Sequence, residues 1–75
     1  MENRIKTVIA DVLMIDLDTL NDESSPETID EWDSLKQMNI IIALEEEFEI
    51  LFSDDDVIEM LNVKLICNIT KDAIS

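Results

Sequence analysis

The chain has 75 residues, and its 19 acidic residues against 5 basic ones give a formal net charge of −14. It has no His and no Gly, which excludes imidazole chemistry, His-ligated metals and Gly-rich phosphate-binding loops. Binding of nucleic acid is not expected, because neutralising phosphates requires a basic surface. The length accommodates one domain, residues 1–75.

The apolar content indicates a folded protein outside the membrane. Hydrophobic residues make up 47% of the chain, which is enough for a core. No apolar run approaches the roughly 20 residues of a spanning helix, so we expect no membrane insertion. The first four residues are not followed by the apolar stretch of a signal peptide. We therefore expect a cytoplasmic protein with basic partners.

An amphipathic helix is predicted over residues 3–14. Its apolar residues recur at the i, i+3, i+4, i+7 and i+8 spacing of one helix face. They are Ile5, Val8, Ile9, Val12 and Leu13.

Residues 15–33 are predicted to form a long loop, because they lack periodicity and contain Pro26. Loops of this length inside a compact domain are often functional. This loop carries eight acidic residues and no basic one: Asp16, Asp18, Asp22, Glu23, Glu27, Asp30, Glu31 and Asp33. Four apolar residues are expected to hold it on the core: Leu17, Leu20, Ile29 and Trp32.

A second helix is predicted to begin at Ser34, with Asp33 as its N-cap, and to end near Glu49. Its expected buried stripe is Leu35, Met38, Ile41 or Ile42, Leu44 or Glu45, and Phe48.

Two more helices are predicted after the second. Ser53 and Asp56 fit a capping box for a short helix over residues 54–61, and a last helix covers 63–74. Val57, Ile58 and Leu61 are expected to face inward from the short helix. No segment shows sustained period-two alternation, so we expect no sheet. The predicted fold is an all-α four-helix bundle with a long first loop and a short third helix.

Ser34 is the side chain whose position points to chemistry. The unpaired N–H groups in the first turn of a helix favour a nearby anion, such as a phosphate ester. The chain has no His and the loop has no Lys, so Ser34 lacks a base and is a poor nucleophile by itself. We therefore expect another enzyme to modify Ser34, and we expect no catalytic residue in this chain.

Asp33-Ser34-Leu35, followed nine residues later by Leu44-Glu45-Glu46-Glu47-Phe48, resembles the acyl carrier proteins. The resemblance covers nearly the whole chain. In that family a DSL tripeptide opens the second helix, and its Ser takes a phosphopantetheine arm from coenzyme A. The resemblance implies that Ser34 carries this arm through a phosphodiester and that the arm's thiol holds an acyl group as a thioester. It also implies that Asp33 helps to orient Ser34 and the cofactor.

The resemblance also implies partners. A phosphopantetheinyl transferase would attach the arm. Acyl-loading and acyl-processing enzymes with basic docking patches would bind the carrier, in fatty-acid, polyketide or related biosynthesis. The implied partner contacts are Leu35, Met38, Glu45, Glu46 and Glu47. Between partners, an acyl chain would lie between the helices against Ile41, Ile42, Leu44 and Leu61.

Three positions depart from the common family pattern. Glu31 stands where a Gly is common, Lys36 where an acid is common, and Asn39 where a Glu is common. These differences favour a specialised stand-alone carrier, for example in secondary metabolism or surface-polysaccharide assembly. Two other functions stay open: an aminoacyl or peptidyl carrier with the same arm, and a non-carrier acidic interaction module that does not need Ser34.

Three further expectations concern metal, thiol and oligomeric state. Four acidic residues match ligand positions of an EF-hand loop, but Asn21 stands where that loop needs Gly, so we expect no metal site. Cys67 is expected to be a small buried residue and not a reactive thiol. A monomer is expected, because no sustained exposed apolar stripe is evident. Ile40, Ile50, Leu51 and Phe52 leave the alternative open.

Overall fold

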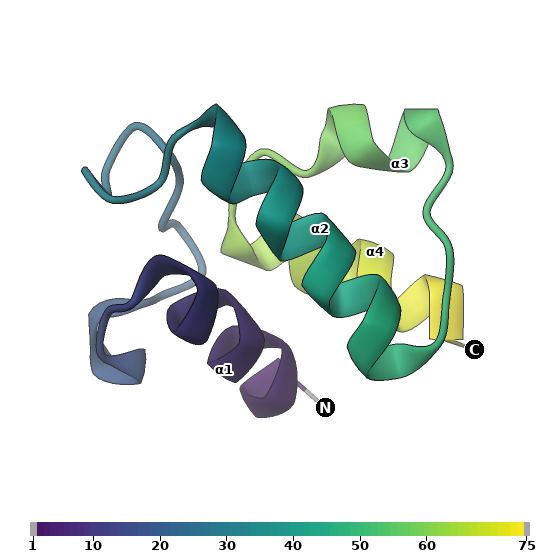
Figure 1. The fold of residues 1–75 in the computed structure, drawn as a ribbon, viewed down its shortest axis with the longest axis horizontal. Helices are drawn as coiled ribbons and strands as arrows, with labels where there is room; N and C mark the ends of the chain where they lie inside the picture. The colour runs from purple at the N-terminus through teal and green to yellow at the C-terminus, as the bar shows by residue number, and fades with distance from the viewer. Residues whose placement is uncertain (1, 75) are drawn as a thin grey trace.

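The computed structural model describes residues 2–74, which form four α-helices (Figure 1). They are α1 (Glu2–Leu13), α2 (Ser34–Phe48), α3 (Asp54–Glu59) and α4 (Val63–Ile74), with a 3₁₀ turn, η1 (Leu17–Thr19), after α1. These residues contain no strand, and the predicted all-α bundle with a long first loop and a short third helix is confirmed. Each predicted helix boundary lies within two residues of the observed one.

The core lies where α1, α2 and α4 meet. α1 packs against both α2 and α4, and α3 packs on α4. In Figure 1, α1 and α2 lie side by side, and α3 lies along the opposite side of α2 from α1. The fully buried apolar side chains of the three longer helices are Ile5, Ile9, Leu13, Ile40, Leu44, Val63 and Ile66. Ile40, which the sequence left as a candidate for an exposed apolar surface, is therefore a core residue.

The first loop is held on the core by three of its four apolar residues. Leu20, Ile29 and Trp32 are buried as predicted. The prediction is wrong for Leu17, which is 41% exposed. Leu20, at the end of the 3₁₀ turn, takes the core position and leaves Leu17, at its start, on the surface.

Hydrogen bonds also tie the loop to the start of α4. The backbone N–H of Val63 donates to Ser24 O at 2.9 Å, and that of Lys64 donates to Asp22 O at 3.0 Å. Because the first N–H groups of a helix have no intrahelical acceptor, these loop carbonyls satisfy donors that would otherwise be unpaired. Lys6 of α1 adds an ion pair to the Asp22 carboxylate at 3.3 Å.

The predicted inward faces of α2 and α3 need correction. α2 buries Ile40, Ile41 and Leu44, whereas Leu35 is 69% exposed and Met38 is 52% exposed. The core face of α2 passes through Ile40, Ile41, Leu44 and Phe48 at helical spacing, and Leu35 and Met38 lie off this face. In α3, Val57 packs on the core, but Ile58 is 71% exposed because the six-residue helix has only one covered side. Leu61 lies beyond the end of the helix and is 65% exposed.

Two helices end in a left-handed residue that is not Gly. Met14 after α1 has φ 60° and Glu49 after α2 has φ 55°. In both cases the next residue closes the helix end: Ile15 N donates to Ala10 O, and Ile50 N donates to Glu45 O, each at 3.1 Å. These are the bonds of a Schellman-type helix end, in which Gly usually takes the left-handed position.

Thr70 on α4 gives a stability prediction. Its side chain is fully buried, and its Oγ1 has no hydrogen-bond partner within residues 2–74. Thr70→Val keeps the shape and removes the unpaired hydroxyl, so we expect the free energy of unfolding to rise by about 1 kcal/mol. Urea unfolding followed by circular dichroism measures this change. The matched control is Thr7→Val, since Thr7 is exposed and donates to Asn3 O at 2.7 Å. A loss of stability in Thr70→Val would contradict the assignment.

Candidate functional site

The site is built where the acidic loop enters α2. Asp33 has extended backbone, and its Oδ1 accepts the backbone N–H of Lys36 at 2.8 Å. The Asp33 carbonyl accepts the N–H of Gln37 at 2.9 Å. Asp33 is therefore the predicted N-cap, and Ser34 is the first residue of α2.

Ser34 is exposed and free. Its hydroxyl makes no hydrogen bond to another group within residues 2–74. The backbone N–H groups of Ser34 and Leu35 also have no acceptor within residues 2–74, because Asp33 accepts only the N–H groups of Lys36 and Gln37. Two free N–H donors beside a free hydroxyl suit a phosphate ester on that hydroxyl. The residues present therefore fit a phosphorylated group.

A hydrogen-bonded chain holds this helix start in place. Trp32 is 2% exposed, and its Nε1 donates to Gln37 Oε1 at 2.6 Å. Gln37 Nε2 in turn donates to Met60 O, just after α3, at 3.1 Å. The expectation that Trp32 anchors the loop is confirmed. Sequence reasoning missed Gln37, and only its position in space beside Trp32 and Met60 reveals its role.

An open cavity of about 680 Å³ lies beside Ser34, between the first loop, α2 and α3. Pro26, Met38, Val57 and Leu61 supply its apolar wall, with Asp33, Ser34 and Gln37 at its polar side. Of the four residues expected to line an acyl chain, the structure brings only Leu61 here. Ile41 and Leu44 are core residues, and Ile42 lines a different groove.

Comparison with known proteins decides the family. A family model described as "Phosphopantetheine attachment site" matches residues 3–69. The chain belongs to this carrier family. Its members carry covalently attached phosphopantetheine, the cofactor that the free hydroxyl and N–H groups fit.

Two solved structures are similar to this carrier. The holo acyl carrier protein from Geobacter metallireducens has a TM-score of 0.87 and 27% identity, over 97% of this chain and 84% of that chain. A chain from a structure named "The ishigamide ketosynthase/chain length factor" has a TM-score of 0.76 and 29% identity, over 97% of this chain and 92% of that chain. The carrier is thus of the acyl carrier type in fold and family.

The three successive glutamates of α2 differ in their surroundings. Glu47 pairs with Arg4 at 2.8 Å, and Arg4 also lies 4.9 Å from the centre of the Phe48 ring. Glu45 is half-buried, and its Oε2 accepts the backbone N–H of Phe52 at 2.9 Å. Glu46 is exposed and has no side-chain partner among the described residues. Of the three, Glu46 therefore presents the free carboxylate.

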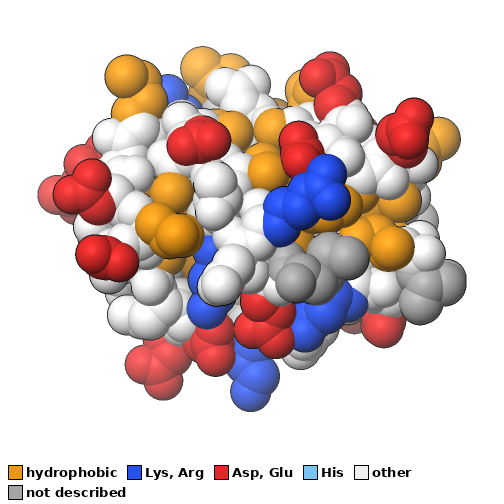
Figure 2. Space-filling model, turned by 90° about the horizontal axis from the view of Figure 1, so that it is seen from below, with side chains coloured by type: hydrophobic (Ala, Val, Ile, Leu, Met, Phe, Trp, Pro, Cys, Tyr) orange, Lys and Arg blue, Asp and Glu red, His pale blue; other side chains and the backbone are white. Residues whose placement is uncertain are grey.

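Charge is unevenly distributed over the carrier. Four of its five basic residues are on α1 and α4: Arg4, Lys6, Lys64 and Lys71. In the view from below, Lys and Arg side chains lie among acidic ones (Figure 2). Lys71 bonds Glu2 at 2.7 Å, which lowers the pKa of Glu2 and raises that of Lys71. Residues 15–59, which run from the loop to the end of α3, carry sixteen acids against Lys36 alone, so this part of the carrier is strongly negative.

Residues 2–74 contain no group of three or more His, Cys, Asp or Glu side chains placed to hold one metal ion. None of the helices in this part of the chain combines the length and the apolar character that crossing a membrane requires.

Proposed function

We propose that this carrier bears phosphopantetheine on Ser34 and presents acyl groups to partner enzymes in the cytoplasm. The observation that carries the proposal is the free Ser34 hydroxyl beside two free backbone N–H groups at the start of α2. The arm supplies the thiol that holds an acyl group as a thioester. The chain itself supplies the attachment oxygen, the Asp33 cap that orders the helix start, and the cavity alongside. In this function the protein is a monomeric substrate of other enzymes and has no catalytic residue.

The partners we propose are enzymes that attach and use the arm. A phosphopantetheinyl transferase delivers the arm from coenzyme A. Since the chain has no His and Ser34 has no neighbouring base, the transferase must accept the Ser34 proton. The similarity to a chain in a ketosynthase/chain length factor structure supports a ketosynthase as one of these partners.

Exposed residues of α2 near Ser34 suit these encounters. Leu35 and Met38 are exposed; Leu35 directly follows Ser34 in α2, and Met38 lines the cavity beside Ser34. Apolar side chains of this kind supply contact area at a docking surface. The negative charge of the loop, α2 and α3 would speed association with basic enzymes and make binding sensitive to salt.

The test is loading by a broad-specificity phosphopantetheinyl transferase with coenzyme A and magnesium. We expect the intact mass to rise by one phosphopantetheine. No gain, with a transferase that modifies a control carrier in the same mixture, would favour a binding module that has kept the carrier fold.

The two thiols of the loaded carrier are expected to differ in reactivity. Burial raises the pKa of the Cys67 thiol above its ordinary value of 9.0, so the buried thiol stays protonated and unreactive near pH 8. The arm's thiol would be exposed. Iodoacetamide should therefore label the native loaded carrier once and the urea-unfolded carrier twice, as read by intact mass.

The unloaded protein and Cys67→Ala are the controls for this labelling. The unloaded native protein should take no label, and loaded Cys67→Ala should take one label in both states. Because the folded-state pKa of Cys67 is raised, its contribution to stability is full below about pH 9 and falls as the pH rises through the folded-state value. Rapid labelling of Cys67 in the native protein would contradict its burial.

A further inference from the structure

A second surface feature lies where α1 ends and η1 begins. Met14 and Leu17 are large apolar side chains that stay 85% and 41% exposed there. η1 packs against α1, so the end of α1 and η1 form one corner of the molecule. None of the residues of this corner lines the cavity beside Ser34. We call it the α1–η1 corner, and its surface residues are Asp11, Met14, Asp16, Leu17 and Asp18.

The backbone of the α1–η1 corner is held in place by the core beneath it. Ile15, between the two apolar side chains, packs against the core. Leu20, just after η1, is buried, and its N–H donates to Leu17 O at 3.0 Å. Met14 and Leu17 therefore project from an ordered segment that is anchored between them and after them.

Met14 is an unfavourable residue for the isolated carrier. Its φ of 60° lies in the left-handed region, which Gly and Asn adopt more readily than Met does. With 85% of the residue exposed, the side chain gains little packing within the carrier in return. Met is also a flexible side chain that adapts its shape to an apolar partner. The Met14 side chain is therefore available for contact with another molecule.

Free carboxylates surround the two apolar side chains. Asp11, Asp16 and Asp18 are exposed, and their carboxylates have no hydrogen-bond or ion-pair partner within residues 2–74. Residues 7–35 contain no Lys or Arg, so no basic side chain of this part of the sequence offsets their charge. The corner thus combines an apolar centre with a negative rim.

We propose that the α1–η1 corner docks a partner protein through an apolar side chain set between Arg or Lys side chains. Charge complementarity selects this occupant, because the carboxylates of the corner are free and no cation accompanies them. Met14 and Leu17 would cover the apolar side chain, and Asp16 and Asp18 would face the cations. α1 and α3 lie on opposite sides of α2 (Figure 1), and α3 helps to form the cavity beside the attachment site. The corner would therefore stay open while another enzyme holds the arm, which rests on the proposed function.

The test uses the Ser34→Ala carrier, which cannot take the arm. The probe is a helical peptide with one Leu flanked by two Arg on the same face, titrated into the ¹⁵N-labelled protein. We expect amide shifts over residues 11–19, and these amides give the affinity of the corner. Met14→Asn should weaken this binding about tenfold, because most of the apolar contact is lost. Its melting temperature should not fall, since Asn adopts the left-handed conformation more readily than Met.

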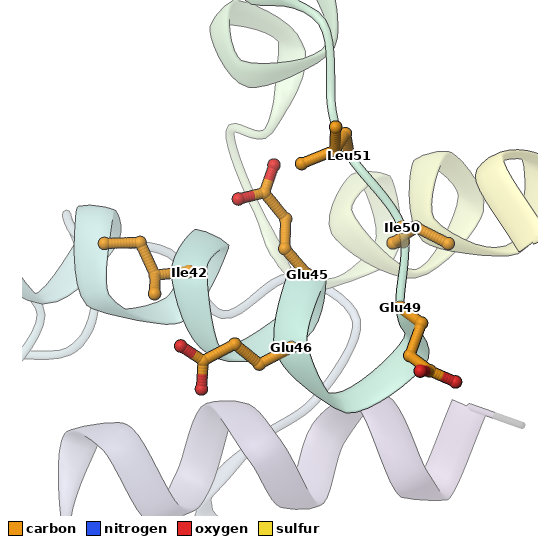
Figure 3. Close-up of a pocket in the computed structure, with 6 residues that line it drawn as sticks. All are labelled: Ile42, Glu45, Glu46, Glu49, Ile50 and Leu51. Atoms are coloured by element: carbon orange, nitrogen blue, oxygen red, sulfur yellow. The ribbon is translucent and has the colours of Figure 1, made fainter.

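Leu51→Ser is the matched control for the apolar contact. Leu51 is 86% exposed, almost as Met14 is, but it lines a separate groove at the end of α2 (Figure 3). Its replacement should leave the affinity of the corner unchanged. Asp16→Asn should weaken binding at low salt and much less at high salt. Asp30→Asn, which removes an exposed carboxylate outside the corner, should change the affinity less.

Three results would overturn the proposal. Unchanged affinity in Met14→Asn would show that charge alone attracts the peptide. Weaker binding to the loaded wild-type carrier than to Ser34→Ala would show that the corner is not open when the arm is present. A dimer of the peptide-free protein that Met14→Asn dissociates, seen by analytical ultracentrifugation, would assign the corner to a second copy of the chain. None of these results bears on whether Ser34 is loaded, which the transferase assay measures separately.

Discussion

Replacing Ser34 with Ala is expected to abolish loading by the transferase completely, because the substitution removes the oxygen to which the arm would be attached. The fold should be unaffected. Ser34 is exposed, its hydroxyl has no partner within the described chain, and Ala is a good helix former at this position. Intact mass after incubation with coenzyme A, magnesium and transferase measures the effect, and circular dichroism confirms the fold.

Ser53→Ala is the matched control for Ser34→Ala. Ser53 also stands exposed at a helix start, but its Oγ accepts the N–H of Asp56 at 3.1 Å in the capping box of α3. We expect Ser53→Ala to load fully and to lose about 1 kcal/mol of stability from the missing cap. Loading that persists in Ser34→Ala would show that another hydroxyl carries the arm. Loss of a cellular function in Ser34→Ala would separate both carrier interpretations from a simple interaction module.

Replacing Trp32 with Ala is expected to cost about 3–5 kcal/mol, as for other large buried aromatic residues. A domain of this size has roughly 4–11 kcal/mol of stability in total, so a large part of that stability should be lost. The indole fills the core between the loop and α2, and its N–H bonds Gln37, which in turn bonds the end of α3. Its loss should therefore disorder the helix start at Ser34 and slow loading as well.

Urea unfolding followed by far-ultraviolet circular dichroism measures this loss, since the variant lacks the single Trp needed for fluorescence. Leu35→Ala is the control, and with 69% of Leu35 exposed it should change stability by less than about 0.5 kcal/mol. The loss of stability in Gln37→Ala should lie between those of Trp32→Ala and Leu35→Ala, at about 1–3 kcal/mol, because the substitution leaves the Trp32 N–H unpaired. A Trp32→Ala protein as stable as wild type would show that the loop is held by other residues.

Local signals predicted the elements of this fold well. The Asp33 cap, the Ser53–Asp56 capping box and the apolar spacing of the first and last helices placed all four helices within two residues of their observed bounds. These signals act over three or four residues, so they can be read from the chain itself. The exposure of Ser34 is predictable for the same reason, because it follows from the place of this residue in the first turn of a helix.

The side chains that depend on three-dimensional packing were not predictable in this way. Leu35 and Met38 fit an apolar stripe in the sequence, but α2 meets the core through Ile40, Ile41 and Leu44, and Leu35 and Met38 stay exposed. Three consecutive glutamates look alike in sequence. Their different surroundings depend on Arg4 and Phe52, which approach from elsewhere in the chain.

The left-handed residues at the ends of α1 and α2 have a consequence for the entropy of the unfolded chain. Holding Met14 and Glu49 in this conformation costs about 1–2 kcal/mol each. An average chain of 75 residues would contain about five glycines, and each non-Gly residue in such a place reduces the conformational freedom lost on folding by about 0.4–1 kcal/mol. The two effects are of similar size and opposite sign. A carrier without glycine thus folds from a stiffer unfolded chain. Glu49→Gly would relieve the backbone strain but give the unfolded chain more freedom, so the free energy of unfolding would rise only by the small difference between the two effects.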